Sequence, residues 1–398
     1  MMNEVVIVST ARTPFDKFGG PLKNMSTVQL ASIATKAAMQ RADLAPQDVE
    51  EYYLGINMPT QNRSIARQAA LESGIPETAN SLTVDRACCS SYSAIAMGYR
   101  AIALGEAKIA VCGGSENMSN VPYFLNDLWW GKRIGDIVLK DIMVVSCPYT
   151  GEPRAVQAGK GAVKYNISRE EQDAWALRSQ QKYAEAEAAG KFDEEIVPVI
   201  LKDRKGKETV ITKDQSPRPE TTLAALSKLP TVYGSPTVTA GNAPGLSTGA
   251  AMVVLMSKAE ADRRGLKPLA TILGHAQASG HPDGIASIPA EAAKKALAKA
   301  NMTVDQIKLI EVNEAFAVMP LVTTKLLGNE EPARVEALRA ITNVNGGAIA
   351  IGHPTGATAA RLVMTVCREM RRRGGGYALA TICGGIGEGE CMVFKVEK

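Results

Sequence analysis

Two cysteines and one histidine have the chemical types and local settings that covalent catalysis uses. Cys88 and Cys383 lie far apart in the chain, and each closes an apolar run and opens into small residues. A cysteine at the start of a helix lies at the positive end of the helix dipole, which favours thiolate over thiol. Because a helical pattern follows Cys88, we predict that this thiol is a nucleophile with a lowered pKa.

His353 is the candidate base for this nucleophile. It is one of three histidines, and it stands in Gly352-His353-Pro354, where proline fixes the backbone and glycine permits close approach. A partner that lowers a thiol pKa of about 8.5 by about two units makes most of the thiol reactive at neutral pH. An isolated cysteine is more often a buried core thiol, but the shared context favours a reactive pair here.

Cys383 and Asn313 complete the set of candidate catalytic residues. A thiol beside a reaction centre can exchange a proton with carbon, and the glycines at 384, 385, 387 and 389 can expose amides to an oxyanion. Asn313 follows the strand-like residues 309–312, and a loop asparagine can orient water or hold a carbonyl oxygen. Taken alone, Cys383 is equally well a strand-end hydrophobe and Asn313 a turn residue.

The elements that must position these residues alternate between strand-like and helical patterns, which is typical of an α/β fold. A strand is expected at 5–9, and a second, short buried strand at 109–112 that ends at Gly113. Capping boxes at Ser26 with Gln29 and at Ser168 with Glu171 each begin a helix, and a glycine at position 190 ends the second. Residues 115–167, which include two adjacent tryptophans, are expected to form an inserted loop region.

An approximate internal repeat organises the chain. Residues 83–116 and 341–389 share the order strand, small-residue turn, helix, strand and glycine pair. The first turn is 88–91 and the second is 346–356, followed by a helix over about 357–373 and a strand from Tyr377 to Cys383. Two pseudo-symmetric α/β halves would bring the two turns together on a shared face, where ligands of open α/β sheets bind.

Composition excludes several classes of protein. The 398 residues are 45% hydrophobic, which indicates about two or three packed units. The 45 basic and 41 acidic side chains nearly balance, so nucleic acid is not an expected partner. We find no signal peptide or membrane-spanning stretch, and the seven cysteines have no paired spacing, which argues against disulfides and a zinc site. We therefore expect a cytoplasmic protein.

Four motifs give the chain a close resemblance to the thiolase family, the acetyl-CoA acyltransferases. The motifs are Asp85-Arg86-Ala87-Cys88-Cys89-Ser90, Asn313-Glu314-Ala315-Phe316-Ala317, the Gly-His-Pro loop within 343–356, and Cys383-Gly384-Gly385-Ile386-Gly387. Residues 66–70, 113–119, 218–223 and 239–243 also match, so the resemblance covers essentially the whole chain. It implies a layered αβαβα core with an N-terminal half at 1–116 and about 191–257, an inserted loop region at 117–190, and a C-terminal half at 258–398.

The resemblance also implies a mechanism. Cys88, activated by His353, would attack an acyl-CoA carbonyl to form an acyl-enzyme, and Cys383 would exchange a proton with the α-carbon of acetyl-CoA. His353 and a water held by Asn313 would stabilise the enolate oxygen. The backbone amides of Cys88 and Gly385 would form a second oxyanion site.

By the same resemblance, coenzyme A is substrate and product, and no permanently bound cofactor or metal is implied. Arg218 is the candidate for the coenzyme A phosphates. The loop at 240–245, with Ala240, Ala243 and Pro244, would line the pantetheine arm, and Phe316 would also contact substrate.

Several positions depart from the family pattern and concern acyl-chain preference and assembly. Tyr149-Thr150-Gly151 stands in place of a frequent His-Met-Gly, and Pro244 in place of a serine. Asp283 occupies the approximate place of a pocket-closing methionine, and Cys89 replaces a frequent glycine. The loop between 120 and 149 is shorter than usual. We expect a homodimer at least and leave a homotetramer open.

The expected activity is that of an acetyl-CoA C-acetyltransferase, which runs reversible Claisen condensation and thiolysis. A degradative 3-oxoacyl-CoA thiolase for longer or modified chains is the alternative. A non-catalytic acyl-CoA-binding subunit is the alternative from another class of function. Binding alone does not require complete catalytic loops, so their presence argues against this alternative.

Overall fold

The core of the protein is one continuous β-sheet that folds into two stacked halves. The computed structural model describes residues 2–58, 60, 62–126, 128–144 and 146–398. Within this part, the strand order is β10-β11-β12-β9-β1-β8-β5-β3-β4, with β2 beside β8 and a separate β6-β7 hairpin. The strands are β1 (Val5–Arg12), β2 (Asp16–Lys17), β3 (Glu51–Gly55), β4 (Asn80–Val84), β5 (Ile109–Asn117), β6 (Val199–Lys202), β7 (Glu208–Ile211), β8 (Ser247–Ser257), β9 (Ala270–Ser279), β10 (Leu309–Val312), β11 (Gly376–Gly384) and β12 (Glu388–Val396).

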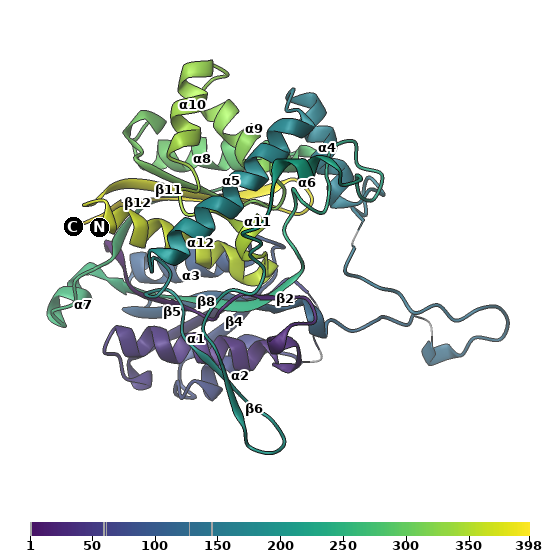
Figure 1. Ribbon diagram of the computed structural model, residues 1–398. Helices are drawn as coiled ribbons and strands as arrows, with labels where there is room; N and C mark the ends of the chain where they lie inside the picture. Colours follow the sequence, from purple (N-terminus) through teal and green to yellow (C-terminus); the bar gives the residue numbers. More distant parts are fainter. Residues whose placement is uncertain (1, 59, 61, 127, 145) are drawn as a thin grey trace.

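Helices lie on both outer faces and between the two halves of the sheet (Figure 1). None in the described part of the chain is long and apolar enough to cross a bilayer. The helices are α1 (Thr27–Arg41), α2 (Ile65–Glu72), α3 (Ser90–Leu104), α4 (Arg154–Lys164), α5 (Arg169–Ala188), α6 (Leu223–Ser227), α7 (Lys258–Arg263), α8 (Ile288–Lys299), α9 (Val318–Leu327), α10 (Pro332–Ala340), α11 (Ala348–Ile351) and α12 (Thr355–Arg372).

The layers follow the expected αβαβα order. In Figure 1, α1 and α2 cover one outer face, α3 and α12 lie between the sheet halves, and α8, α9 and α10 cover the other outer face. The halves join where β1 pairs with β9 through only two residue pairs, Val6 with Thr271 and Ile7 with Ala270. Both faces of the sheet are therefore covered, which explains why every residue of β8 and β5 is buried.

The predicted internal repeat is visible in the strand pairing. In the N-terminal half, β3 pairs parallel with β5, and β5 pairs antiparallel with β8. In the C-terminal half, β10 pairs parallel with β11, and β11 pairs antiparallel with β12. Since α3 precedes β5 and α12 precedes β11, both halves place a central-layer helix directly before an equivalent strand.

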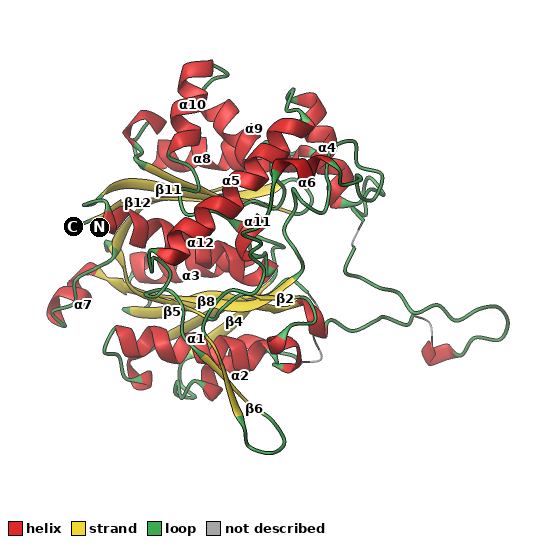
Figure 2. Cartoon of the chain, viewed as in Figure 1, coloured by secondary structure: helices red, strands yellow, loops and turns green. Residues whose placement is uncertain are grey.

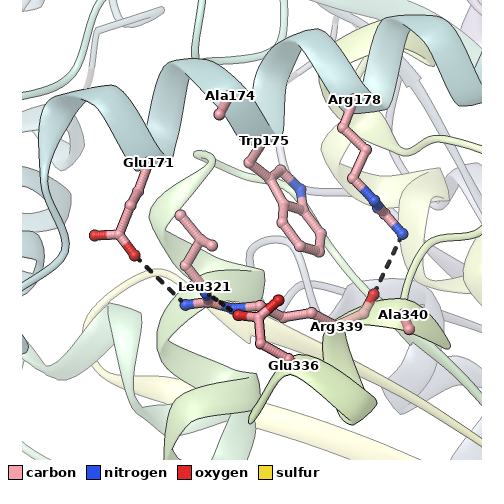
Figure 3. A pocket seen from close by; sticks show the side chains of 8 residues that line it. All are labelled: Glu171, Ala174, Trp175, Arg178, Leu321, Glu336, Arg339 and Ala340. Atoms are coloured by element: carbon pink, nitrogen blue, oxygen red, sulfur yellow. Dashed lines mark hydrogen bonds and ion pairs between the residues drawn. The ribbon is translucent and has the colours of Figure 1, made fainter. Parts of the chain in front are cut away.

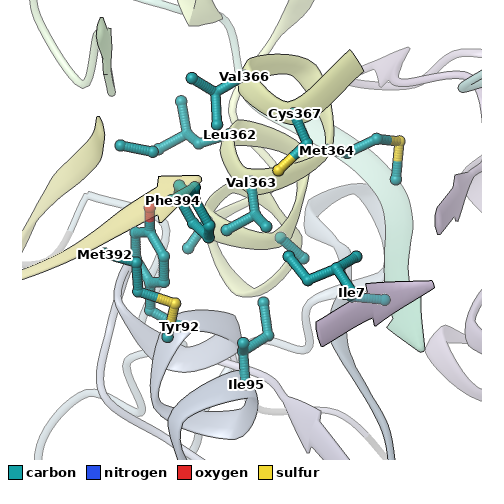
Figure 4. Packing of buried hydrophobic residues seen from close by; sticks show 14 of the residues in the cluster. Ile7, Tyr92, Ile95, Leu362, Val363, Met364, Val366, Cys367, Met392 and Phe394 are labelled. Atoms are coloured by element: carbon teal, nitrogen blue, oxygen red, sulfur yellow. The ribbon is translucent and has the colours of Figure 1, made fainter. Parts of the chain in front are cut away.

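The central layer holds the largest hydrophobic cluster. Tyr92 and Ile95 of α3 pack with Val363 of α12 and Phe394 of β12 (Figure 4). Every residue of α12 from Thr355 to Cys367 is buried, polar side chains included, as expected for a helix enclosed on all sides. This packing fixes the starts of α3 and α12 relative to each other, and both starts carry candidate catalytic residues.

The local predictions were largely confirmed, with two corrections. Both capping boxes form, at Ser26 and at Ser168. The strand predicted to end at Gly113 instead continues to Asn117, because glycines at 113 and 114 serve close packing and do not form a turn. A Cβ at Gly114 would lie 1.9 Å from the carbonyl oxygen of Gly356. The expected loop at 115–167 also contains α4.

An irregular arm leaves the body between the short 3₁₀ turn η3 (Met118–Asn120) and α4. Its described residues extend away from the layered core as loops with one short helical turn (Figure 2). Trp129 and Trp130 on this arm are 95% and 92% exposed. The arm thus carries two large apolar side chains that the rest of the chain does not cover.

Candidate active site

Cys88 stands on a tight turn between β4 and α3. Ala87 just before it has a φ of +49°, a left-handed conformation that is uncommon for residues with a side chain. Ser90 holds this turn, since its Oγ donates to the Ala87 carbonyl at 2.6 Å and accepts from the Arg86 N–H at 2.9 Å. The N-cap of α3 is Cys89 rather than Cys88. The nucleophile candidate therefore lies one residue outside the helix end.

His353 lies at the entrance to α12 with its imidazole against Cys88. Its Nε2 is 3.2 Å from Cys88 Sγ. Its backbone N–H donates to Ser247 Oγ at 3.0 Å. Gly352 must be glycine, because its φ is +105° and a Cβ there would lie 2.4 Å from the same Ser247 oxygen. The structure thus brings together two residues that the sequence analysis paired.

Thr358 defines the tautomer of His353. The Thr358 hydroxyl donates to the Pro354 carbonyl at 2.9 Å, and it lies 2.7 Å from His353 Nδ1. Because its only proton is used, the hydroxyl oxygen accepts from Nδ1–H. His353 Nε2 therefore presents a lone pair to the Cys88 thiol, as a general base must.

The resting pair is neutral, which corrects the prediction of a thiolate at Cys88. Burial raises the pKa of the Cys88 thiol above its ordinary value, and the neighbouring Cys383 adds to this effect. Burial lowers the pKa of His353 to about 3, and the positive charge of Arg361 contributes. The helix dipole favours ionisation locally, but desolvation by the surrounding layers outweighs it.

Asn313 follows β10 and lies beside the same imidazole. Its Nδ2 is 3.4 Å from His353 Nε2. Its Oδ1 is buried and has no hydrogen-bond partner among the described residues. A buried acceptor of this kind can hold a water or a substrate group next to His353.

Glu314, to which the sequence analysis gave no role, holds this loop in place. Its carboxylate accepts from Trp175 Nε1 at 2.9 Å, Ser179 Oγ at 2.7 Å, Asn343 Nδ2 at 2.9 Å and the Ile349 N–H at 3.1 Å. These donors come from α5, the segment between α10 and α11, and α11 itself. The motif quoted from the sequence contains Glu314, but only the fold reveals its donors.

Cys383 ends β11 next to the nucleophile turn. A Cβ at Gly384 would lie 3.1 Å from Cys89 Sγ, which places the two cysteine segments in contact. Burial raises the pKa of Cys383 to about 12. Cys88, His353, Asn313 and Cys383 therefore meet from both halves of the fold, as predicted.

Glu116 connects the His353 turn to the N-terminal half and was also missed. It is fully buried, and its Oε2 accepts from Thr355 Oγ1 at 2.8 Å and from the Gly356 N–H at 3.0 Å. It also accepts from the Asn57 N–H at 3.1 Å. Burial raises its pKa to about 7 despite these donors.

The predicted substrate-binding residues lie on loops at 218, 240–244 and 316. The Ala317 N–H donates to Asn242 O at 2.9 Å, which joins the loop after β10 to the loop with Ala243 and Pro244. Ala243 and Phe316 are half-buried, and Ala240 is exposed. Arg218 is exposed and is anchored by its N–H to Gln180 Oε1 at 2.8 Å.

A groove between α5, α9 and α10 lies on another part of the molecule (Figure 3). It has an apolar floor and a charged rim. None of the predicted catalytic residues lines it. Its lining residues are Glu171, Ala174, Trp175, Arg178, Leu321, Glu336, Arg339 and Ala340.

Comparisons with known proteins agree with this geometry. The family model described as "Thiolase, N-terminal domain" matches residues 5–259, and "Thiolase, C-terminal domain" matches residues 266–396. Acetyl-CoA acetyltransferase of Cupriavidus necator is 41% identical over 402 residues, covering 100% of both chains. The human mitochondrial 3-ketoacyl-CoA thiolase is 37% identical, covering 99% of each.

Solved structures show the same fold. The crystal structure of the Bacillus anthracis acetyl-CoA acetyltransferase aligns with a TM-score of 0.94 at 36% identity, covering 99% of each chain. Human mitochondrial 3-ketoacyl-CoA thiolase in complex with CoA aligns with a TM-score of 0.91 at 36% identity, covering 99% of this chain and 98% of that one. The chain therefore belongs to the thiolase family and is an acyltransferase of the kind that works through a cysteine acyl-enzyme.

Proposed function

We propose that Cys88 is the acyl-carrying nucleophile of this thiolase and that His353 is its base. The 3.2 Å contact between Cys88 Sγ and His353 Nε2 carries this proposal, together with the Thr358 contact that leaves Nε2 unprotonated. Because the pair rests in its neutral form, the thiol proton passes to Nε2 as sulfur attacks the acyl-CoA carbonyl. His353 then returns this proton to the departing coenzyme A sulfur.

The tetrahedral oxyanion of this step is assigned to the backbone amides of Cys88 and Gly385. Each such donor contributes roughly 3 kcal/mol to the transition state by analogy with other acyl-transfer enzymes. Arg218 is assigned to the coenzyme A phosphates, and the loop at Ala240, Ala243 and Pro244 to the pantetheine arm, with Phe316 beside it. The exposed position of Arg218 supports contact with a charged group that stays near solvent.

Cys383 is assigned to the second half of the reaction. In condensation it takes a proton from the α-carbon of acetyl-CoA, and in thiolysis it returns a proton to the departing enolate. The enolate oxygen lies against His353 and a water on Asn313, which the unpartnered Oδ1 of Asn313 supports.

We propose acetyl-CoA C-acetyltransferase activity for the shortest substrate. The relatives' names divide between acetyl-CoA acetyltransferase, 3-ketoacyl-CoA thiolase and a β-ketoadipyl-CoA thiolase of Pseudomonas knackmussii that is 40% identical. Degradative thiolysis of longer or modified chains is the second candidate. The guanidinium of Arg154, which lies against Gly385 after Cys383, favours it.

Two exposed features support a homo-oligomer. The edge strand β4 leads directly into the Cys88 turn, and its Leu82 is 46% exposed. Unpaired strand edges are ready sites for pairing with another chain. We propose that a second copy covers this edge and that the Trp129-Trp130 arm contacts further copies in a tetramer. Substituting both tryptophans with serine should then reduce a tetramer to a dimer in light scattering.

A cytoplasmic location is also proposed, since all seven cysteines are free thiols.

The test is coenzyme A-dependent thiolysis of 3-oxoacyl-CoAs of increasing chain length. Cys88→Ala should abolish acyl-enzyme formation. Cys383→Ala should still acquire an acetyl group at Cys88 from acetyl-CoA, where coenzyme A is the leaving group, but fail to cleave or form the carbon–carbon bond. Normal turnover by Cys383→Ala would refute its assigned role, and absence of acylation in the wild type would favour the binding-subunit alternative.

A further inference from the structure

An arginine that the proposed reaction does not use lies beside the two reactive thiols. Arg154 is the first residue of α4, and its guanidinium packs against the loop that follows Cys383. A Cβ at Gly385 would lie 3.1 Å from Arg154 Nη2 and 3.5 Å from both Cζ and Nε. Three guanidinium atoms at nearly equal distance indicate that the group lies across Gly385, which also belongs to the proposed oxyanion site.

The guanidinium lies close enough to both thiols for its charge to act on them. Its positive charge lowers the pKa of both Cys88 and Cys383, against the larger opposing effect of burial. An acyl group on Cys88 Sγ must occupy the space between the two thiols, because Cys383 has to reach the α-carbon that bonds to it. A substituent further along the acyl chain can therefore meet Arg154.

No carboxylate pairs with Arg154 in the part of the chain that the structure describes. Its Nη1 donates to the neutral amide oxygen of Gln157 at 2.8 Å. The nearby Glu152 is paired with Lys160, whose side chain points to solvent. A half-buried guanidinium without a counter-ion is unfavourable, so this arrangement favours an anion supplied from outside.

Gln157 fixes the direction in which the arginine points. It is fully buried, and its Nε2 donates to Asp283 Oδ1 at 2.8 Å and to Thr150 Oγ1 at 3.2 Å. Its amide oxygen must therefore face Arg154. Asp283 is an anion in the same neighbourhood, but its charge is engaged by this amide, and Gln157 separates it from the guanidinium.

The thiolate form of Cys147 is the other group that can balance the positive charge of Arg154. Burial raises its pKa, but hydrogen bonds from Thr150, from the 149–150 backbone and from Arg154 outweigh burial and lower it to about 7. Because a guanidinium has five donors in a planar fork, a contact with one sulfur leaves donors for a second acceptor.

We propose that this thiolase accepts acyl chains that end in a carboxylate, which Arg154 binds, so that its physiological 3-oxoacyl-CoA is the thioester of a dicarboxylic acid. This inference rests on the proposed roles of Cys88 and Cys383. A carboxylate matches the guanidinium fork with two parallel hydrogen bonds. An alkyl chain of equal length leaves the guanidinium desolvated and unpaired, and so it is disfavoured.

The test compares thiolysis of 3-oxoadipyl-CoA, 3-oxohexanoyl-CoA with the same carbon count, and acetoacetyl-CoA. The wild type should prefer the carboxylate substrate over its alkyl counterpart by roughly tenfold or more in kcat/KM. Arg154→Met keeps the side-chain length without charge and should remove this preference. Arg154→Lys should retain part of it. Lys164→Met, which removes an exposed charge at the far end of the same helix, should leave it unchanged.

The outcomes separate this inference from the proposed function. An equal loss on all three substrates in Arg154→Met would show that the guanidinium serves the common chemistry, and it would overturn the carboxylate assignment while the thiolase reaction stands. A wild-type preference for the alkyl substrate would overturn it as well. If no substrate acylates Cys88, the proposed function itself fails. Thermal melting of Arg154→Met shows whether a loss of activity reflects unfolding.

Discussion

Thr358→Val tests whether the tautomer of His353 controls the reaction. Valine has nearly the shape of threonine but lacks the hydroxyl. The substitution therefore removes the acceptor that lies 2.7 Å from His353 Nδ1 and the donor to the Pro354 carbonyl at 2.9 Å. Thr358 is a positioning residue here, because it acts on the reaction only through His353.

The size of the effect follows from the lost hydrogen bond. A buried Nδ1–H without an acceptor costs about 1–3 kcal/mol. The imidazole can relieve this cost by moving its proton to Nε2, and this second tautomer cannot accept the Cys88 proton. At about 1.4 kcal/mol per factor of ten, the active fraction should fall roughly 5- to 150-fold.

The assay is the rate of acylation of Cys88 by acetoacetyl-CoA, followed as loss of the 3-oxoacyl absorbance in a single turnover. The acylation rate and kcat should fall together, while KM changes little because Thr358 is not assigned to bind substrate. Thr358→Ser is the matched control, and it should retain most of the activity. If Thr358→Val acylates within roughly twofold of the wild type while it remains folded, the argument from the tautomer is wrong.

Four further predictions concern stability and reactivity. Glu314→Gln should lower the free energy of unfolding in urea by about 2–4 kcal/mol, because the new amide group faces N–H and O–H donors. Gly114→Ala should cost about 3 kcal/mol or more in thermal unfolding, since its Cβ meets the Gly356 carbonyl at 1.9 Å and neither backbone can yield freely. Glu369 is desolvated, but its hydrogen bonds and neighbouring cations lower its pKa to about 2. The ionised Glu369 side chain therefore stabilises the fold fully above the ordinary carboxyl pKa of about 4.5, and this stabilisation is lost as the pH falls towards 2. In Glu369→Gln, the midpoint of urea unfolding should depend less on pH over this window. The alkylation rate of Cys88 by iodoacetamide should still rise above pH 8.5, about the ordinary thiol pKa, because burial raises the pKa of this thiol. If the alkylation rate reached its plateau below neutral pH, Cys88 would be a thiolate at rest, and the assignment of a neutral Cys88–His353 pair would be wrong.

The proposed catalytic residues were accessible from sequence because each stands in a recognisable local setting. Cys88 precedes a helical pattern, His353 lies between glycine and proline, and Cys383 ends a strand before glycines. The repeat of strand, turn, helix and strand was also sufficient to predict that the two turns meet. The sequence pattern could not predict the protonation states of Cys88 and His353, because desolvation depends on how many layers of the fold cover the site.

The residues that the sequence analysis missed act across the fold. The four donors to Glu314 come from segments that a local pattern does not connect. The position of Arg154 against Gly385 depends on where the chain returns after the arm, and the arm has no periodicity from which that could be inferred. Gly113 and Gly114 were interpreted as a turn, because glycine occurs both in turns and where two backbones pack closely. Only the position of the Gly356 carbonyl shows that close packing is the reason here.

The distance between Cys88 and His353 depends on contacts between the two halves of the fold. Each residue is anchored within its own half, Cys88 by Ser90 and His353 by Thr358. The halves are joined next to the site by Ala360 N–H, which donates to Ser91 Oγ at 3.1 Å, and by the bonds from the start of α12 to Glu116. Because a general base loses its effect when its distance from the nucleophile grows, small shifts at these joints should reduce acylation before they unfold the protein. The reactivity of the thiol is therefore a property of the packed pair of halves rather than of either turn alone.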